Sequence, residues 1–325
     1  MANLRSDDAI QEGIAWLSLS KLQARFAHYL NEEGITHLIV VNSPALAALR
    51  PKVAWSGYWI LWNHHWIDQP ALAPLGDPAL RNRWDAIVSL SEFHHRGMAG
   101  RFGLAQGKHW ILRNAASPHV ATLYRNWDEF RDERMARRSA RWIYTSTPFR
   151  GLDVLVAAWR RLNPPPDWSC TALTGMSLYH SDDPNFDELL DVVAATPGMR
   201  RLEPVGQGAL APLLAEHDFW AYPCTWLETS CISAVEAVGA GLYPVTTDLG
   251  ALGETLEGWG TFVIGEREGL IERWSDAARA EASRRDADRE AWLRVAWDHR
   301  MRIVSQWTWA RRAREWNNCL QKLGA

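Results

Sequence analysis

The chain has 325 residues, of which 47% are hydrophobic and 22% charged, and its formal net charge is -3. At roughly 150 residues per domain, this length predicts two domains, each large enough to bury a core. The balanced charge excludes a disordered chain, and the mildly acidic total argues against a dedicated nucleic-acid-binding protein. Tryptophan supplies 20 of the 35 aromatic residues, and arginine outnumbers lysine 31 to 4. We interpret most of this excess as compositional bias and core packing.

The amino terminus lacks a charged segment followed by an apolar one, so we expect no signal peptide. No stretch approaches the ~18 consecutive apolar residues of a membrane span. The cysteines form neither a C-x-x-C pair nor a metal-ligand spacing, which predicts reduced, mostly buried thiols. They are Cys170, Cys224, Cys231 and Cys319. We therefore expect a soluble, cytoplasmic protein.

In the first third of the chain, a helical pattern over residues 8–31 precedes four short apolar segments, each ending in a polar residue. Such segments are typical of buried parallel strands. The four predicted strands span residues 37–42, 58–63, 86–91 and 109–114.

After residue 140, apolar strand patterns alternate regularly with helical ones, which predicts a second parallel sheet covered on both faces. The strands are predicted at residues 141–146, 170–175, 219–224, 242–247 and 261–265, with a weaker candidate near 199–205. The helices between them are predicted at residues 151–162, 186–195, 208–216, 231–240 and 250–257. Residues 266–325 are predominantly helical in pattern.

Residues 124–141 are polar and rich in arginine. We interpret this segment as a linker with a helical turn, whose arginines form a solvated face between the domains. The alternative is that these arginines contact a membrane or an anionic ligand.

Ligands of parallel α/β sheets bind at the carboxyl ends of the strands, and residues 219–247 are the richest such place. A strand ends near Cys224, Glu228 follows in the loop, and a helix begins near Ser230 with Glu236 inside it. The free N–H groups of a helix start bind anions, whereas a carboxylate beside them suits the hydroxyls of a sugar or a ribose. Taken alone, the two glutamates favour a structural interpretation, with Glu228 as a helix-start charge and Glu236 on a solvated helix face.

The surrounding motifs change that interpretation. The run from Glu228 to Glu236 matches an E-x7-E signature, and residues 237–245 (AVGAGLYPV) resemble the A-x-A-x-G-x-P-V run that follows it. Further matches are residues 146–152, 250–255 and 85–93, with Asn114 in place of an N-G turn. On these residues the sequence resembles the retaining glycosyltransferases of family 4.

The resemblance implies an α/β chain of the GT-B fold, in which two Rossmann-like domains face each other across a cleft, here with a shortened first domain. The implied boundaries are 1–125 for the acceptor-side domain, 126–140 for the linker, 141–305 for the nucleotide-sugar-binding domain, and 306–325 for a helix that packs back on the first domain.

The resemblance also implies roles for individual residues. Glu228 is the catalytic carboxylate and contacts the donor sugar, Glu236 holds the ribose hydroxyls, and Arg150 faces the diphosphate. The remaining donor-binding residues are Ser146, Gly151, Gly175, Val205, Gly206 and Gln207, with the backbone of Ser230, Cys231 and Ile232. No metal or cofactor is implied, since the UDP- or GDP-linked sugar is a substrate, and Asp182-Asp183 reads as a turn rather than a metal motif.

Three departures from the family stand out. Thr145 occupies the position of a second basic residue, so the hydroxyls of Ser146 and Thr147 and the helix dipole must stabilise more of the diphosphate charge. Thr229 and Cys231 stand where the family often has glycines. The opening strand and glycine-rich loop of the family's first domain are missing.

Residues 55–69 hold four tryptophans and two histidines at the end of a predicted strand. His64 and His65 are candidate catalytic residues, and Trp62, Trp66 and Asp68 are candidates for the acceptor side. Trp66 is the ring best placed to stack on a sugar. The alternative is that Trp59 and Trp62 are core residues and that one histidine caps the turn.

These features predict a retaining, metal-independent glycosyltransferase that moves a hexose from a nucleotide-diphosphate sugar to a hydroxyl acceptor, in glycan or glycoconjugate biosynthesis. The acceptor is left open among a lipid-linked glycan, a polysaccharide, a protein and a small molecule, as is peripheral membrane contact. Nucleic acid is not an expected partner. The alternatives are a non-catalytic glycosyltransferase-like subunit or sugar-nucleotide-binding partner, and a glycoside phosphorylase on the same fold.

Overall fold

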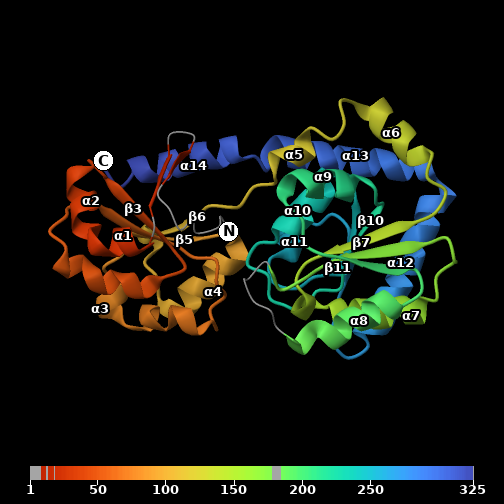
Figure 1. Cartoon of the computed structure of the whole chain (residues 1–325), viewed down its shortest axis with the longest axis horizontal. Coiled ribbons are helices and arrows are strands. Elements are labelled where there is room, and N and C mark those ends of the chain that lie inside the picture. Colours follow the sequence, from red (N-terminus) through yellow and green to blue (C-terminus); the bar gives the residue numbers. More distant parts are fainter. Residues whose placement is uncertain (1–8, 12–13, 18, 178–183, 325) are drawn as a thin grey trace. The chain divides into compact units, whose positions relative to one another are not determined.

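The computed structural model describes residues 9–11, 14–17, 19–177 and 184–324, which divide into two compact units (Figure 1). The first unit holds the described residues of Met1–Leu90, His95–Ile111 and Asn317–Ala325. The second unit holds Ser91–His94 and Leu112–Trp316.

The first unit contains a four-stranded parallel sheet in the order β3-β4-β5-β6, as the sequence predicts. Its strands are β3 (His37–Val41), β4 (Tyr58–Trp62), β5 (Ala86–Ser89) and β6 (His109–Ile111). The segments between and after them are η1 (Pro44–Lys52), η2 (Pro70–Gly76), α3 (Pro78–Arg81), α4 (Glu92–Phe102) and η3 (Gln106–Lys108). The buried side chains of Trp59, Leu61 and Ile87 lie in the core of this unit.

The start of the chain differs from the helix predicted over residues 8–31. Two short strands, β1 (Ala9–Gln11) and β2 (Ile14–Trp16), pair antiparallel, and only then do α1 (Leu19–Ala24) and α2 (Phe26–Glu32) follow. The β-branched and aromatic residues of these two strands favour extended backbone over the helical periodicity. The helical prediction is therefore wrong for the first half of this segment.

The second unit contains a six-stranded parallel sheet in the order β12-β11-β10-β7-β8-β9. The strands are β7 (Arg141–Thr145), β8 (Ser169–Leu173), β9 (Met199–Leu202), β10 (Phe219–Tyr222), β11 (Tyr243–Thr247) and β12 (Thr261–Val263). All six lie where the sequence predicts them, the weaker candidate included. The strand order reverses between β7 and β10, which pair directly, and such a reversal opens a crevice at the carboxyl ends of the strands.

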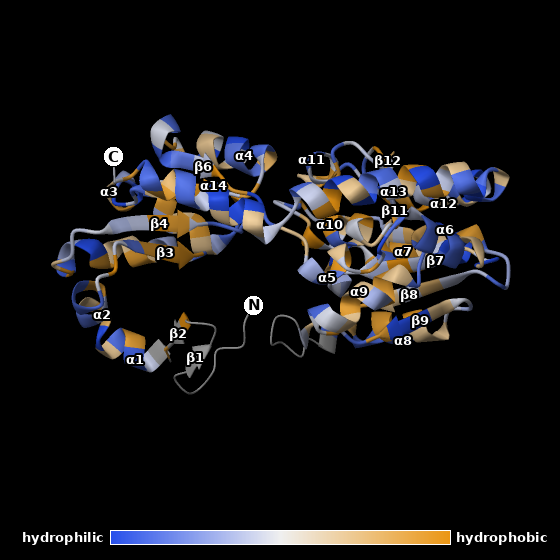
Figure 2. Cartoon of the chain, turned by 90° about the horizontal axis from the view of Figure 1, so that it is seen from above, coloured by the Kyte–Doolittle hydropathy of each residue, from blue (hydrophilic) through white to orange (hydrophobic). Residues whose placement is uncertain are grey.

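Helices cover both faces of this sheet, with α7 and α8 on one side and α9, α10 and α13 on the other (Figure 1). The helices are α5 (Pro118–Ala121), α6 (Trp127–Met135), α7 (Leu152–Leu162), α8 (Asp187–Ala195), α9 (Gln207–Ala215), α10 (Ile232–Gly239) and α11 (Leu252–Thr255), with 3-10 turns η4 (Pro148–Arg150) and η6 (Pro184–Phe186). The predicted helical tail is present as α12 (Leu270–Ala287), α13 (Arg289–Gln306) and α14 (Trp309–Gln321). Both hydrophobic and hydrophilic residues lie along α12 and α13 (Figure 2).

Tryptophan builds much of the core, as the sequence predicts for most of these residues. Trp142 stacks on Phe219 with ring centroids 4.1 Å apart. The tryptophans with at most 1% of their surface exposed are Trp59, Trp84, Trp142, Trp159, Trp220 and Trp274.

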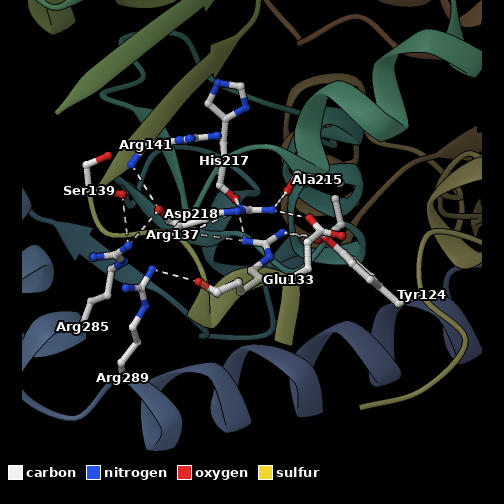
Figure 3. Close-up of polar contacts among 12 residues, drawn as sticks. Tyr124, Glu133, Arg137, Ser139, Arg141, Ala215, His217, Asp218, Arg285 and Arg289 are labelled. Atoms are coloured by element: carbon white, nitrogen blue, oxygen red, sulfur yellow. Dashed lines mark hydrogen bonds and ion pairs between the residues drawn. The ribbon is translucent and has the colours of Figure 1, made fainter. Parts of the chain in front are cut away.

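The arginine-rich segment forms a nine-residue helix, α6, instead of a single turn, and only part of it is a solvated face. Arg134 of α6 is fully buried and donates to the backbone oxygens of His217 and Ala240. Arg137 donates to the backbone oxygen of Ala215 (Figure 3). These carbonyls follow or end α9 and α10, where the last carbonyls of a helix lack intrahelical partners, and one guanidinium offers five donors to meet them. The predicted solvated face is therefore wrong at these two arginines.

A single buried carboxylate organises the same region. Asp218, 1% exposed, accepts hydrogen bonds from the Arg141 backbone and from Arg285, which itself is fully buried (Figure 3). Since Arg141 begins β7 and Asp218 precedes β10, this cluster lies at the amino ends of the central strands. It therefore belongs to the frame of the second unit and not to the crevice.

Among the described residues, no helix is both long and apolar enough to cross a membrane. Three of the four cysteines are buried and Cys319 is partly exposed.

Candidate functional site

The crevice of the second unit places two of the predicted site residues in direct contact. Arg150 ends the 3-10 turn η4 after β7, and Glu228 lies in the loop after the neighbouring strand β10. Their side chains form an ion pair, with Arg150 Nη1 2.7 Å from Glu228 Oε1. The Glu228 side chain is 5% exposed and the Arg150 side chain 23%, so the cation is the more accessible partner.

The same carboxylate oxygen has a second donor that the sequence analysis missed. The hydroxyl of Tyr222, the last residue of β10, donates to Glu228 Oε1 over 2.6 Å. The hydroxyl of Ser146, another predicted site residue, lies 3.4 Å from that of Tyr222. The available signal in the sequence was a tyrosine at the carboxyl end of a strand next to the point of reversal. An aromatic residue inside an apolar strand, however, is normally interpreted as a core residue.

Two glycines allow the loops of the crevice to approach each other. Gly151 has a φ of 113°, and a β-carbon there would lie 2.2 Å from the backbone oxygen of Pro223. Gly250 has a φ of 68°, and its β-carbon would lie 2.4 Å from the backbone oxygen of Glu228. Only glycine takes such angles readily, so both contacts need it. The glycines therefore fix the backbone that carries Arg150 and Glu228.

Glu236, predicted to hold a ribose, lies inside α10 and is 4% exposed. Burial raises the pKa of its carboxyl to about 7, although the backbone N–H of Ser117 and the side chain of Gln207 both donate to it. The structure thus brings Glu236 and the predicted residue Gln207 together. The alternative of a solvated helix face is wrong for Glu236.

The start of α10 carries the predicted anion-binding backbone. Cys231 is the N-cap residue, and its side chain makes no capping hydrogen bond. Burial raises the pKa of the Cys231 thiol well above its usual value, so the group stays protonated. Asn114, identified by the resemblance, donates to the hydroxyl of Ser230 over 3.3 Å, while Ile232 remains 39% exposed. The helix start thus presents polar backbone beside the Arg150–Glu228 pair.

Two other predicted glycines differ in their surroundings. A β-carbon at Gly175 would lie 2.9 Å from Pro204, so the packing of this chain itself requires glycine there. Gly206 precedes α9 and has nothing within 4 Å of such a β-carbon, which leaves open space beside it. Thr147 is 3% exposed, so its hydroxyl lies in the interior of the unit.

Asp182 and Asp183 lie outside the described residues. Within the described part of the chain, no group of three or more His, Cys, Asp or Glu side chains is placed to hold a metal ion.

In the first unit, the predicted histidines form a turn held by two asparagines that the sequence analysis missed. The His64 backbone N–H donates to Asn42 Oδ1 over 2.6 Å, and that of His65 donates to Asn63 Oδ1 over 3.1 Å. Asn42 has a φ of 58° and Asn63 is fully buried, so both are committed to shaping the turn. Burial, followed by the nearby His65, lowers the pKa of His64 to about 4. His64 is therefore neutral near pH 7.

The aromatic residues of this turn are only partly accessible to a ligand. The ring of Trp62 lies 4.8 Å from that of His64, and both are half-buried. Trp66 packs on Gly97 so closely that a β-carbon there would lie 2.4 Å from the indole. Asp68 is exposed, and Trp59 is core, as the structural alternative predicts.

A further carboxylate of the second unit was missed as a functional group. Glu254 accepts hydrogen bonds from the backbone N–H groups of Glu92 (2.9 Å) and Phe93 (3.0 Å) and from Arg113 (2.8 Å). Burial alone would raise the pKa of Glu254, but these donors outweigh it and lower the pKa. Ser91, beside them, donates to the backbone oxygen of Thr229 over 2.7 Å, directly after Glu228.

No protein-family model and no curated protein matches the sequence. Solved structures do match. A glycosyltransferase from Rickettsia africae ESF-5 has a TM-score of 0.73 at 11% identity, over 93% of this chain and 80% of that one. Sucrose-phosphate synthase from Thermosynechococcus elongatus has a TM-score of 0.68 at 15% identity, over 97% and 82%.

A third match is Anabaena HepE in complex with UDP and glucose, with a TM-score of 0.68 at 13% identity, over 93% of this chain and 82% of that one. At these identities the likeness establishes the fold, which is GT-B as the sequence predicts. It leaves the chemistry to be argued from the site.

Proposed function

We propose that the chain is a glycosyltransferase that moves a sugar from a nucleotide-diphosphate donor to a hydroxyl acceptor. The observation that carries this is the buried carboxylate of Glu228, held at the point of strand reversal by Arg150 and Tyr222. Ligands bind at such a point in open parallel sheets, and a carboxylate held between two donors is suited to sugar hydroxyls. Anabaena HepE, which shares the fold, was solved with UDP and glucose.

In this proposal the sugar is a hexose, transfer proceeds with retention, and no metal is required. Glycosyl transfer passes through an oxocarbenium-like state while the diphosphate leaves with growing negative charge. Arg150 and the first N–H groups of α10 would face that charge, and Glu228 would bind the hydroxyls of the donor sugar. Glu236 and Gln207 would bind the nucleoside.

Nucleotide release from a panel of UDP-, GDP- and ADP-sugars tests the proposal. Glu228→Gln should lower the rate about 100-fold, a typical loss for one charge-stabilising group. Glu281→Gln is the matched control, because Glu281 is also a buried carboxylate (5% exposed) paired with an arginine, Arg284, but belongs to α12. That variant should keep the wild-type rate within about twofold.

The remaining outcomes separate the rival functions. If no donor binds or is turned over by the wild type, the proposal fails. Binding without turnover would instead indicate a sugar-nucleotide-binding subunit, and phosphate-dependent breakdown of a disaccharide would indicate a phosphorylase. The anomeric configuration of the product and the rate in EDTA test retention and metal independence.

A further inference from the structure

Tyr222 is locked in place by its neighbours. Its ring stacks on that of Trp220, with centroids 4.5 Å apart and an angle of 28°, and contacts Tyr144 at 5.7 Å. The Trp220 indole N–H donates to the hydroxyl of Thr145 over 2.9 Å. All four residues lie on β7 or β10, the strands on either side of the point of reversal. The hydroxyl of Tyr222 therefore has a fixed direction, toward Glu228.

Thr145 accounts for the position of Trp220. Thr145 is a small hydroxyl residue at a position where the resemblance to family 4 implies a second basic residue beside the diphosphate. Here the hydroxyl anchors Trp220, and Trp220 in turn fixes Tyr222. A neutral O–H donor thus stands beside Glu228 in addition to the one cation, Arg150.

We propose that Tyr222 is a positioning residue for Glu228 in the glycosyl transfer proposed above, on which this inference rests. Glu228 Oε1 has two donors, Arg150 Nη1 at 2.7 Å and the Tyr222 hydroxyl at 2.6 Å. The Arg150 side chain is 23% exposed, so it is the more accessible of these two hydrogen-bond donors and is attracted to the diphosphate of a bound nucleotide-sugar. Tyr222 is fully buried and neutral, so its hydrogen bond holds the carboxylate when Arg150 turns to the leaving group.

The phenol is suited to this role because it does not ionise. Burial, followed by the charge of Glu228, raises the pKa of Tyr222 well above its usual value, so its proton stays available for donation. The hydroxyl of Ser146 lies 3.4 Å from that of Tyr222, and either oxygen can be the donor in this contact. The titratable groups around Glu228 are Arg150, Tyr144, Tyr222, Cys224 and Cys231.

Tyr144 provides a matched control within the same cluster. It is fully buried like Tyr222, and its ring touches that of Tyr222, but its hydroxyl donates to the backbone oxygen of Thr147 over 2.7 Å. Tyr222→Phe and Tyr144→Phe each remove one buried hydroxyl and keep the ring. Only the first change removes a donor from Glu228.

The experiment measures kcat and KM for the nucleotide-sugar with both variants. Tyr222→Phe should lower kcat about 10- to 100-fold with KM changed less than about threefold, because a hydrogen bond to a charged group is lost after the nucleotide-sugar has bound. Tyr144→Phe should keep the wild-type kcat within about threefold.

A kcat for Tyr222→Phe within twofold of wild type, or an equal effect of Tyr144→Phe, would overturn the proposal. If Tyr222→Phe does not fold, 3,5-difluorotyrosine at position 222 replaces it; as a stronger hydrogen-bond donor it should change kcat while KM stays the same, and an unchanged kcat would overturn the proposal.

If the wild type turns over no donor, the proposed function itself fails. The positioning role is then decided by the carboxylate stretching frequency of Glu228, taken from the infrared difference between wild type and Glu228→Gln. An unchanged frequency in the Tyr222→Phe background would overturn it.

Discussion

The α-carbon of Gly151 faces the backbone oxygen of Pro223 at a distance that leaves no room for a β-carbon, which would lie 2.2 Å from that oxygen. The contact joins the turn that ends in Arg150 to the end of β10. A hydrogen bond from the Thr225 backbone N–H to the Arg150 backbone oxygen (3.3 Å) links the same two segments, which together form a junction. Arg150 and Glu228 are thus brought together by backbone packing as well as by charge.

Gly151→Ala should destabilise the protein by about 2 to 4 kcal/mol, since the residue has a φ of 113° and the clash is with backbone. Gly206→Ala is the control, because it has a negative φ and open space around its β-carbon position, and its free energy of unfolding should stay within about 0.5 kcal/mol of wild type. Urea unfolding measures both. Equal stability of the two variants would contradict this account of the junction.

Glu236 should make stability depend on pH. Its folded-state pKa of about 7 lies above the ordinary value of 4.5, so its stabilising contribution is complete below about pH 4.5 and is lost as the pH rises through 7. Glu236→Gln should therefore gain stability over wild type by about 2 to 3 kcal/mol between pH 5 and pH 8. Urea unfolding at these two pH values checks the difference, and a constant difference would show that Glu236 is not the titrating group.

The same variant should bind nucleotide less tightly. A ribose hydroxyl donates better to a carboxylate than to an amide, so Glu236→Gln should weaken binding of the nucleoside diphosphate about tenfold at pH 8. Isothermal titration calorimetry measures this affinity. Unchanged binding would separate Glu236 from the nucleoside site while leaving its effect on stability in place.

Arg134 should matter for folding far more than its charge suggests. Arg134→Met leaves the backbone oxygens of His217 and Ala240 without this donor, which costs about 2 to 5 kcal/mol. Arg131→Met, on the same helix but with a third of its side chain exposed, should cost less than about 1 kcal/mol. Chemical unfolding measures the free energy of unfolding of both variants. An equal loss in the two would show that the buried guanidinium of Arg134 does not stabilise the fold.

Glu254 should stabilise the second unit in a pH range opposite to that of Glu236. Its pKa is lowered below 4.5, so its contribution is present above that value and lost as the pH falls through the lower folded-state pKa. Glu254→Gln should cost about 1 kcal/mol at pH 7 and nothing once the wild-type carboxyl is protonated. Thermal melting at pH 7 and at successively lower pH, with the exposed Glu272→Gln as control, measures the loss.

The sequence predicted the strands and the helix that carries Glu236 because continuous apolar runs between turns report burial on both faces directly. It also predicted that Gln207 and Glu236 belong to one site, by resemblance. The contact between Tyr222 and Glu228 could not be predicted, since the alignment of a hydroxyl with a carboxylate depends on how the rings of β7 and β10 pack. The burial of Arg134 could not be predicted either, because its partners are backbone oxygens. Every residue has a backbone oxygen, so such a contact produces no pattern in the sequence.

The two parallel sheets also differ in how the deletion of one strand would affect the pairing of the others. In the four-stranded sheet of the first unit, strands that are consecutive in the sequence pair with each other, so deleting β3 would remove an edge and separate no other pair. In the second unit, β7 lies between β8 and β10, and deleting it would split the sheet through the crevice itself. A strand can therefore be lost at the β3 edge of the first sheet without changing the pairing of the other strands. The second sheet, in contrast, must keep its central strands β7 and β10 for Arg150 and Glu228 to be in contact.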